Sequence, residues 1–167
     1  MKTLALSVLL LFPGFALQAA EIVAEPFPPA QMTSLYIQKD EHGTTKTIQL
    51  AGENIVYQVS TGGKVIETVK VKPSGDDWFQ FIQKLNEAKV YKWAPKYYYP
   101  GQGAAWVIDL SMEGRKFSSS GTNEFPKDGA EAQPMADPKG GESLAFQLFW
   151  QAALGLVGKA AATGSPK

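Results

Sequence analysis

The sequence predicts an α+β domain in which an antiparallel β-sheet of five to six strands carries two helices packed on one face. Three observations lead to this fold class. Short segments between residues 32 and 71 alternate polar and apolar side chains and are separated by turn residues, which is typical of antiparallel strands. Residues 103–126 have the pattern of a β-hairpin. Two other stretches repeat apolar residues with the period of an α-helix.

The hairpin is the clearest of these elements. In residues 105–112 the side chains alternate, with Trp106 and Leu110 on the apolar face and Asp109 on the polar face. Glu113-Gly114 fits a two-residue turn, because glycine readily takes the positive φ that such turns require. The resulting register places Arg115 opposite Met112, Phe117 opposite Leu110 and Gly121 opposite Trp106.

Four strands are expected before the hairpin, at residues 33–39, 45–51, 54–60 and 64–71. The turns between them are residues 40–43, Gly52-Glu53 and Thr61-Gly62-Gly63, all rich in turn-forming residues. For the last turn we expect a three-residue loop with a bulge at a glycine. That register collects the apolar residues of both strands on one face and leaves only Glu67 out of place.

The first helix is expected to begin after Ser74. Ser74 is a natural N-cap, and Asp77 stands where the acid of a capping box belongs. The helix has a narrow apolar stripe, so we expect it to lie across a sheet. The stripe consists of Trp78, Phe81, Ile82, Leu85 and Ala88.

The second helix, from about Glu142 to Val157, is apolar nearly all round. Such a helix is either buried on two sides or meets a partner with one side. We therefore expect either burial or a homodimer through the C-terminal helix, with Phe146 and Trp150 at the interface. The helix is too short to span a bilayer, which needs about 20 apolar residues.

The first twenty residues have the pattern of a cleavable signal peptide, with Lys2, an apolar run, and a cut after Ala19 or Ala20. A proline-rich extended leader at residues 21–31, a single domain at 32–158 and a disordered tail at 159–167 are expected to follow. The mature protein is therefore predicted to be periplasmic or secreted, with no transmembrane segment after cleavage of the signal.

The composition argues against several classes of function. The chain has no cysteine and a single histidine, His42, which speaks against disulfides, thiol chemistry and the usual zinc sites. Removing Lys2 from the 16 basic residues leaves 15, against 16 acidic ones, so no nucleic acid partner is expected. The sequence has no phosphate-loop or dinucleotide motif, so we expect no cofactor and no metal.

Aromatic residues supply the best candidates for a binding surface. Residues 93–99 contain Trp93, Tyr97, Tyr98 and Tyr99, and rings with polar tips suit sugar faces and protein hot spots. Three consecutive tyrosines cannot all point inward from an extended segment, so at least one is expected to be exposed. The alternative is that these rings close the end of the core.

A polar segment at the end of the hairpin is the second candidate. Ser119, Ser120 and Asn123 can present hydroxyls and turn amides to a sugar or an anion. The alternative is an ordinary strand end followed by a turn that uses Asn123 and Gly121.

Two carboxylates on the hairpin allow a different function. Asp109 and Glu124 would make the protein a small hydrolase of cell-wall or sugar polymers if they faced each other across a bound chain. Against this, Asp109 lies diagonally across from Lys116 on the polar face and fits an ordinary cross-strand ion pair. A third class, a carrier of a small ligand between sheet and helices, would need an unfilled core.

Several of these residues together resemble a family of small exported bacterial domains of unknown function. The resemblance covers roughly residues 55–156, and the family has no established activity to transfer. It therefore implies a domain type and nothing catalytic. The matching positions are Trp78, Phe81, Leu85, Trp93, Tyr99, Gly103, Trp106, Gly121, Asn123 and Pro126.

From the sequence, then, we expect a non-enzymatic periplasmic or secreted module that binds a protein or a cell-envelope component through an aromatic surface. An inhibitor or immunity-like role is a special case that nothing in the sequence selects. The hydrolase is the alternative.

Overall fold

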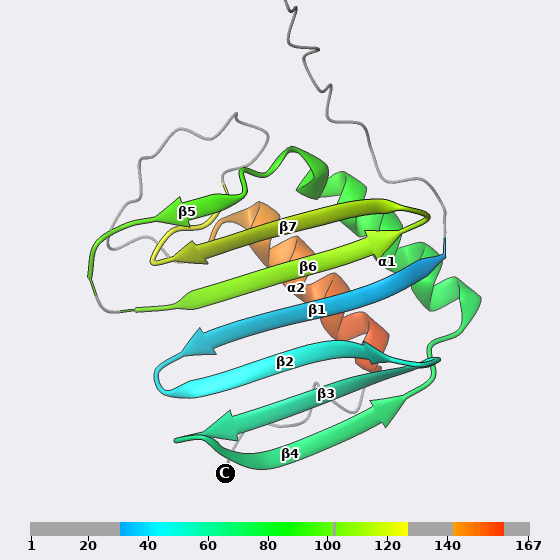
Figure 1. The fold of residues 1–167 in the computed structure, drawn as a ribbon, viewed down its shortest axis with the longest axis horizontal. Helices are drawn as coiled ribbons and strands as arrows, with labels where there is room; N and C mark the ends of the chain where they lie inside the picture. The colour runs from blue at the N-terminus through cyan, green and yellow to red at the C-terminus, as the bar shows by residue number, and fades with distance from the viewer. Residues whose placement is uncertain (1–30, 102, 127–141, 159–167) are drawn as a thin grey trace, which may run out of the picture.

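A computed structural model describes residues 31–101, 103–126 and 142–158. The chain forms one seven-stranded sheet with two helices, α1 and α2, behind it (Figure 1). The α+β class with helices on one face is therefore confirmed. The expected signal peptide, all of the leader except Gln31, and the tail lie outside the described residues. The elements are β1 Met32–Glu41, β2 Thr44–Ala51, β3 Asn54–Thr61, β4 Lys64–Val71, α1 Gly75–Glu87, the 3-10 turn η1 Val90–Lys92, β5 Lys96–Tyr98, β6 Ala105–Met112, β7 Arg115–Thr122 and α2 Leu144–Val157.

The sheet has one strand more than the upper limit that we expected, and it is mixed. Its order is β4-β3-β2-β1-β6-β7-β5, in which every pair is antiparallel except β5 with β7. The additional strand is β5, which lies within the aromatic segment. A strand of three residues has no measurable alternation of its own, and tertiary pairing alone establishes it.

The hairpin of β6 and β7 has the predicted register. Met112 faces Arg115, Leu110 faces Phe117, and Trp106 faces Gly121. The turn residues Glu113 and Gly114 both have positive φ, as a tight hairpin of this kind requires. The polar and apolar alternation is therefore enough to fix this part of the sheet.

The turn between β3 and β4 differs from the expectation. Thr61 pairs with Lys64, so the loop has two residues, Gly62 and Gly63, and the bulge lies at the Val59/Ser60 step of the pairing. Beyond the bulge the apolar residues of the two strands still share one face as expected, since Val59 lies opposite Glu67 and Tyr57 opposite Val69. The irregularity thus falls within the ladder, and its consequence is that Val65 is exposed.

Both helices lie on the same side of the sheet (Figure 1). Helix α1 begins with the predicted capping box, in which Ser74 Oγ accepts from Asp77 N and Asp77 Oδ2 accepts from Ser74 N. Helix α2 is capped by Ser143, whose side chain accepts from Phe146 N. The two helices pack against each other, and α2 also contacts β3 and β4. Between helices and sheet lies one continuous apolar core.

Candidate functional site

The side of the sheet away from the helices is covered by no described element (Figure 1). Alternate side chains of each strand point to this side, which we call the open face. Cross-strand partners share a face, so the pairing defines three rows that run across the strands. The first is Tyr98, Thr122, Ala105, Asp40, Thr45 and Ser60; the second is Lys96, Ser120, Val107, Gln38, Thr47, Gln58 and Thr68; the third is Ser118, Asp109, Tyr36, Gln49, Val56 and Lys70.

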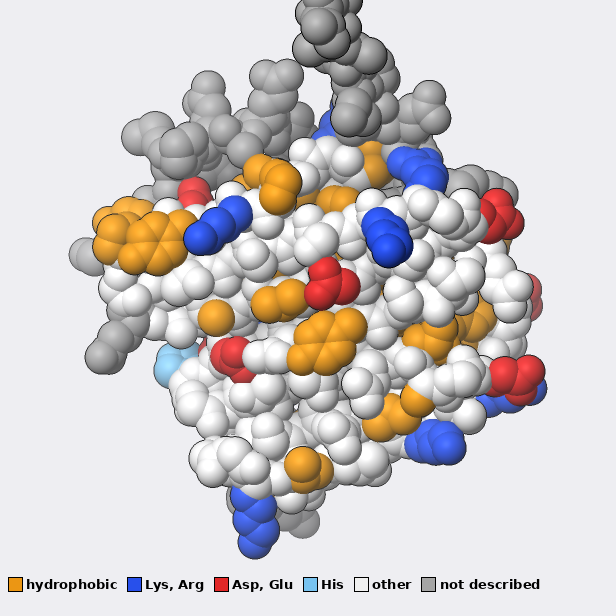
Figure 2. All heavy atoms as spheres, viewed as in Figure 1, with side chains coloured by type: hydrophobic (Ala, Val, Ile, Leu, Met, Phe, Trp, Pro, Cys, Tyr) orange, Lys and Arg blue, Asp and Glu red, His pale blue; other side chains and the backbone are white. Residues whose placement is uncertain are grey.

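Most positions of the open face carry a hydroxyl or an amide side chain. Figure 2 shows this face, and charged side chains are scattered over it without a large patch of either sign. In the three rows the charged residues are two acids, Asp40 and Asp109, and two lysines, Lys96 and Lys70, and a shorter row of Ser34, Ser111 and Lys116 adds a third lysine. The surface is therefore polar, close to neutral, and able both to donate and to accept hydrogen bonds.

A chain of side-chain hydrogen bonds runs along the middle strand, β1. The Tyr36 hydroxyl donates to Gln38 Oε1 over 2.5 Å, and Gln38 Nε2 donates to Asp40 Oδ2 over 2.7 Å. The three residues are two apart in sequence, so they stand side by side on the open face. Each bond restricts the rotamers of its partners, and the centre of the face is thus ordered in advance.

Tyr98 lies at one edge of the open face, on β5, and 61% of its surface is exposed. The backbone around it is held firmly. Tyr98 N donates to Glu124 Oε2 over 2.7 Å, and Tyr99 N donates to Thr122 O over 3.0 Å. The aromatic ring is thus presented to solvent from a fixed strand.

Two other aromatic candidates lie in the core. Trp93 and Tyr97 are buried, with Trp93 Nε1 donating to Ala88 O and the Tyr97 hydroxyl accepting from Ala94 N. Burial raises the pKa of Tyr97 above its ordinary value, and the negative charge of Glu124 adds to this. These two rings close the end of the core, which is the alternative that the sequence left open, while Tyr99 is half-buried.

The serine candidates divide between the two faces of β7. Ser119 is fully buried and donates to Ala94 O over 2.6 Å, which ties β7 to the segment before β5. Ser120 points the other way, onto the open face, opposite Val107. Strand alternation therefore gives the two neighbours different surroundings.

Asn123 braces the chain that follows β5. It has a positive φ of 56°, and its Nδ2 donates to Gly101 O over 2.7 Å and to Tyr99 O over 3.3 Å. Gly103 leaves the space for this side chain, because a Cβ there would lie 2.1 Å from Asn123 Oδ1. These contacts are turn-forming, so Asn123 holds the strand that bears Tyr98.

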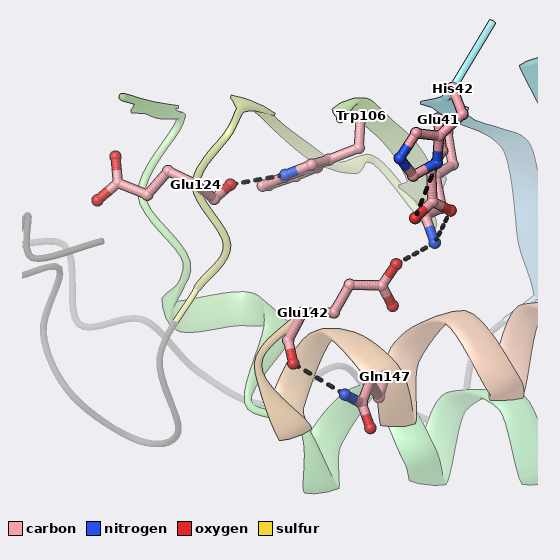
Figure 3. A network of polar contacts seen from close by, with 7 residues as sticks. Glu41, His42, Trp106, Glu124, Glu142 and Gln147 are labelled. Carbon is pink, nitrogen blue, oxygen red and sulfur yellow. Dashed lines mark hydrogen bonds and ion pairs between the residues drawn. The ribbon is translucent and has the colours of Figure 1, made fainter. Parts of the chain in front are cut away.

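Asp109 and Glu124 lie in different surroundings. Asp109 is exposed on the open face, opposite Tyr36 and Ser118. Glu124 is buried after the end of β7, where its carboxylate accepts from Tyr98 N. Its carbonyl accepts from Trp106 Nε1 (Figure 3). The two carboxylates therefore differ in surroundings, since Asp109 is solvent-exposed and Glu124 is buried and bound to a backbone N–H.

The two interface candidates on α2 lie in the core. Phe146 and Trp150 are only 1% and 5% exposed, which fits the alternative of burial on two sides that the sequence left open. Phe146 packs against the rings of Trp106 and Phe125, with centroid distances of 5.2 and 4.7 Å. The helix is therefore buried along both of its apolar faces, and its exposed residues include Leu144 and Gln151.

An ion cluster around the buried Lys39 joins β1 to the start of α2, and the sequence pattern did not predict it. Lys39 forms ion pairs with Glu142 and, over 3.1 Å, with Glu41, and its Nζ lies 5.6 Å from the Trp150 ring centroid. Burial lowers the pKa of Lys39, but hydrogen bonds and charge attraction from Glu142 and Glu41 outweigh it and raise the pKa above 10.5. Figure 3 shows Glu142 reaching from the start of α2 toward Glu41.

The sequence did not predict the cluster because Lys39 and Glu142 are about a hundred residues apart. A lysine at an inward position of a strand was the only available signal, since buried lysine is rare unless it is paired. Neighbouring His42 is exposed in the β1–β2 turn, as expected for a turn histidine.

One hollow lies away from the open face, beside the β2–β3 turn and the start of α1. Its volume is about 270 Å³, and its walls include Met32, Leu50 and Trp78 together with the Glu53–Lys72 ion pair. Gln31 and Pro73 also border it. The small-ligand carrier stays a prediction.

In the part of the chain that the structure describes, no group of three or more His, Asp or Glu side chains is placed to hold a metal ion. None of the helices within these residues is long and apolar enough to cross a membrane.

The fold and the open face define an α+β domain with a solvated polar sheet surface. Comparison of the chain with models of protein families, with curated proteins and with solved structures finds no match. The resemblance to small exported bacterial domains stays a prediction from its motif residues.

Proposed function

We propose that the protein is a non-enzymatic binding module, periplasmic or secreted, that recognises a protein or a cell-envelope component through the open face of its sheet. The observation that carries this proposal is the position of Tyr98. Its ring is 61% exposed on β5, in a cross-strand row that also carries the hydroxyls of Thr122, Thr45 and Ser60. The other rings of the aromatic segment are buried or half-buried.

The distribution of charge supports recognition over simple solvation. A sheet face that only contacts water commonly carries lysine and glutamate, which are among the residues most often exposed. Here most side chains of the face carry a hydroxyl or an amide, and it has neither glutamate nor lysine on the central strands β1 and β6 within the three rows. The hydrogen-bonded Tyr36, Gln38 and Asp40 side chains reduce the entropy lost on binding.

Compared with the sequence expectation, the proposed surface is shifted. Tyr98 and Ser120 remain in it, while Trp93, Tyr97 and Ser119 belong to the core. Asn123 holds the chain that follows Tyr98 through its bonds to Tyr99 O and Gly101 O. Tyr36 and Gln38, which the sequence did not single out, join it.

Co-sedimentation with an isolated bacterial envelope fraction tests the proposal. The native protein is expected to pellet with the fraction, and Tyr98→Ala is expected to remain in the supernatant. Phe79→Ala is the matched control, because Phe79 is an aromatic residue 49% exposed on α1, on the helix side of the sheet. Equal pelleting of native protein and Tyr98→Ala would remove the open face from the proposal.

The export part of the proposal has its own measurement. A signal peptide cut after Ala19 or Ala20 leaves a mature protein whose first residue is Ala20 or Glu21. N-terminal sequencing of the protein recovered from the periplasm or medium should find one of these. A chain that begins at Met1 and stays in the cytoplasm would contradict export.

A further inference from the structure

We propose that the ligand of the open face is a linear, uncharged glycan chain. This inference rests on the proposed function, because it names the ligand of the same surface. It follows from what the surface offers chemically and from the distance between its two tyrosines.

The charges of the face do not suit a polyanion. Two lysines and two acids are distributed over its three rows, Lys116 adds one lysine in a shorter row, and Asp40 and Asp109 lie near the centre of the sheet, on β1 and β6. Binding to nucleic acid depends on several clustered Lys and Arg side chains that neutralise phosphates. An uncharged ligand avoids repulsion from both acids.

The side chains of the face are also a poor match for a protein partner. Protein interfaces are enriched in aromatic residues, Met and Arg, whereas Ser, Thr and Val rarely act as hot spots. The central rows hold Thr47, Gln58, Ser120 and Val107 with few large apolar groups among them. Such a surface has little apolar area to bury against another protein.

A polyhydroxylated chain matches the same side chains. Each sugar hydroxyl both donates and accepts hydrogen bonds, and so do the Ser and Thr hydroxyls, while Gln offers one group of each kind. The exposed Tyr98 ring supplies an apolar face with a polar tip, which suits the mixed surface of a sugar ring. The ordered side chains of Tyr36 and Gln38 present the second binding position at the centre.

The separation of the two tyrosines sets the size of the ligand. Tyr36 on β1 and Tyr98 on β5 are three strands apart, which is roughly 14 Å at the usual strand spacing. Tyr98 is in the row of Asp40, four residues from Tyr36 along β1, which adds roughly 13 Å in the perpendicular direction. A monosaccharide cannot contact both rings, so the ligand is an extended chain.

Titration with uncharged hexasaccharides tests this inference. The probes are chitohexaose, cellohexaose and maltohexaose, each compared with its own monosaccharide by NMR chemical-shift mapping and calorimetry. At least one hexasaccharide is expected to bind at least tenfold more tightly than its monosaccharide, with shifts at Tyr36 and Tyr98. Absence of binding by all three, or shifts confined to the helix side, would overturn the glycan assignment.

Variants tie the binding to the open face. Tyr98→Ala should weaken hexasaccharide binding at least tenfold, and Thr47→Val, which removes one central hydroxyl without changing the shape, should weaken it about two- to tenfold. Phe79→Ala should leave the affinity unchanged. If Tyr98→Ala and Phe79→Ala bind equally well, the sugar is held elsewhere and the inference fails.

The envelope experiment separates failure of this inference from failure of the proposed function. Suppose that no hexasaccharide binds but pelleting with the envelope persists and still depends on Tyr98. The open face is then a binding surface for another ligand, and only the glycan assignment is lost. Loss of pelleting after protease treatment of the envelope would identify a protein ligand and overturn the glycan. Failure of both assays would overturn both proposals.

Discussion

Gly121 lies against the edge of the Trp106 ring so closely that no side chain fits between them. A Cβ added at Gly121 would be 2.3 Å from Trp106 Nε1 and 2.6 Å from the carbonyl oxygen of Glu124. The same indole nitrogen donates to that carbonyl over 2.9 Å. Glycine at this position therefore permits both the burial of the largest core side chain and the bond that satisfies its only polar atom.

Gly121→Ala is expected to destabilise the protein by about 2–4 kcal/mol. Overpacking costs about 1–3 kcal/mol, and the displaced Trp106 hydrogen bond adds about 1 kcal/mol. Urea denaturation followed by tryptophan fluorescence measures the change. Gly155→Ala is the control, because no atom lies within 4 Å of its added Cβ and alanine favours a helix, so it should stabilise by about 0.5–1 kcal/mol. A Gly121→Ala protein as stable as the native one would contradict the close contact.

Ser119 and Ser120 are expected to respond in opposite ways to alanine. Ser119→Ala removes a buried hydroxyl that donates to Ala94 O, so it should lower the free energy of unfolding by about 1 kcal/mol. Ser120→Ala should leave stability within about 0.5 kcal/mol, as surface changes usually do, and should weaken ligand binding on the open face. Thermal unfolding and envelope co-sedimentation measure the two effects. Loss of binding in Ser119→Ala at unchanged stability would reverse this assignment.

Phe146→Ala is expected to lower stability by about 3–5 kcal/mol, because it empties a fully buried aromatic position between α2 and the sheet. Leu144→Ala is the matched control on the same helix, since Leu144 is 60% exposed and should tolerate the change within about 0.5 kcal/mol. Denaturation curves measure both. Light scattering of the folded variants tests the homodimer separately. A Phe146→Ala protein with native stability and altered mass would restore Phe146 to an interface.

These residues also show how far the sequence predicts the structure. The register of β6 with β7 was predictable, because shifting it by one residue would move Phe117 from the helix side to the open face. The capping box of α1 was predictable for a similar reason: its signal is local, and Ser74 and Asp77 suffice. Local patterns with one acceptable solution are the part of a fold that a single sequence reveals.

The remaining features depend on contacts between distant segments. Strand β5 forms because Lys96 and Tyr98 pair with Ser120 and Thr122. The sequence of a three-residue segment does not predict this pairing. The division of the aromatic segment into one exposed and two buried rings follows from that pairing. Likewise, Phe146 and Trp150 looked like interface residues because the helix is apolar all round. The structure resolves this pattern by placing the helix between the sheet and α1.

Glu142→Gln is expected to destabilise the protein by about 1.5–3 kcal/mol, the usual worth of a hydrogen bond to a charged group. Within the described residues, the substitution leaves Glu41 as the remaining ionic partner of the buried Lys39 ammonium. The control is Glu53→Gln, which breaks a 2.6 Å pair with Lys72 whose two side chains are 77% and 66% exposed. An exposed pair contributes at most about 1 kcal/mol, so the control should change stability less.

The Lys39–Glu142 ion pair also predicts how stability depends on pH. The pKa of Lys39 is raised above 10.5 in the folded protein, so the folded state holds this proton more tightly than the unfolded chain does. Its contribution is complete below pH 10.5 and is lost as pH rises through the folded pKa. Burial also raises the pKa of Tyr57 and Tyr97, so ionisation of these two phenols lowers stability as pH rises. This loss is the same in the native protein and in the variant. Urea denaturation from pH 9 upward should therefore show stability falling more steeply in the native protein than in Glu142→Gln, and parallel curves would mean that Glu142 does not hold the Lys39 proton.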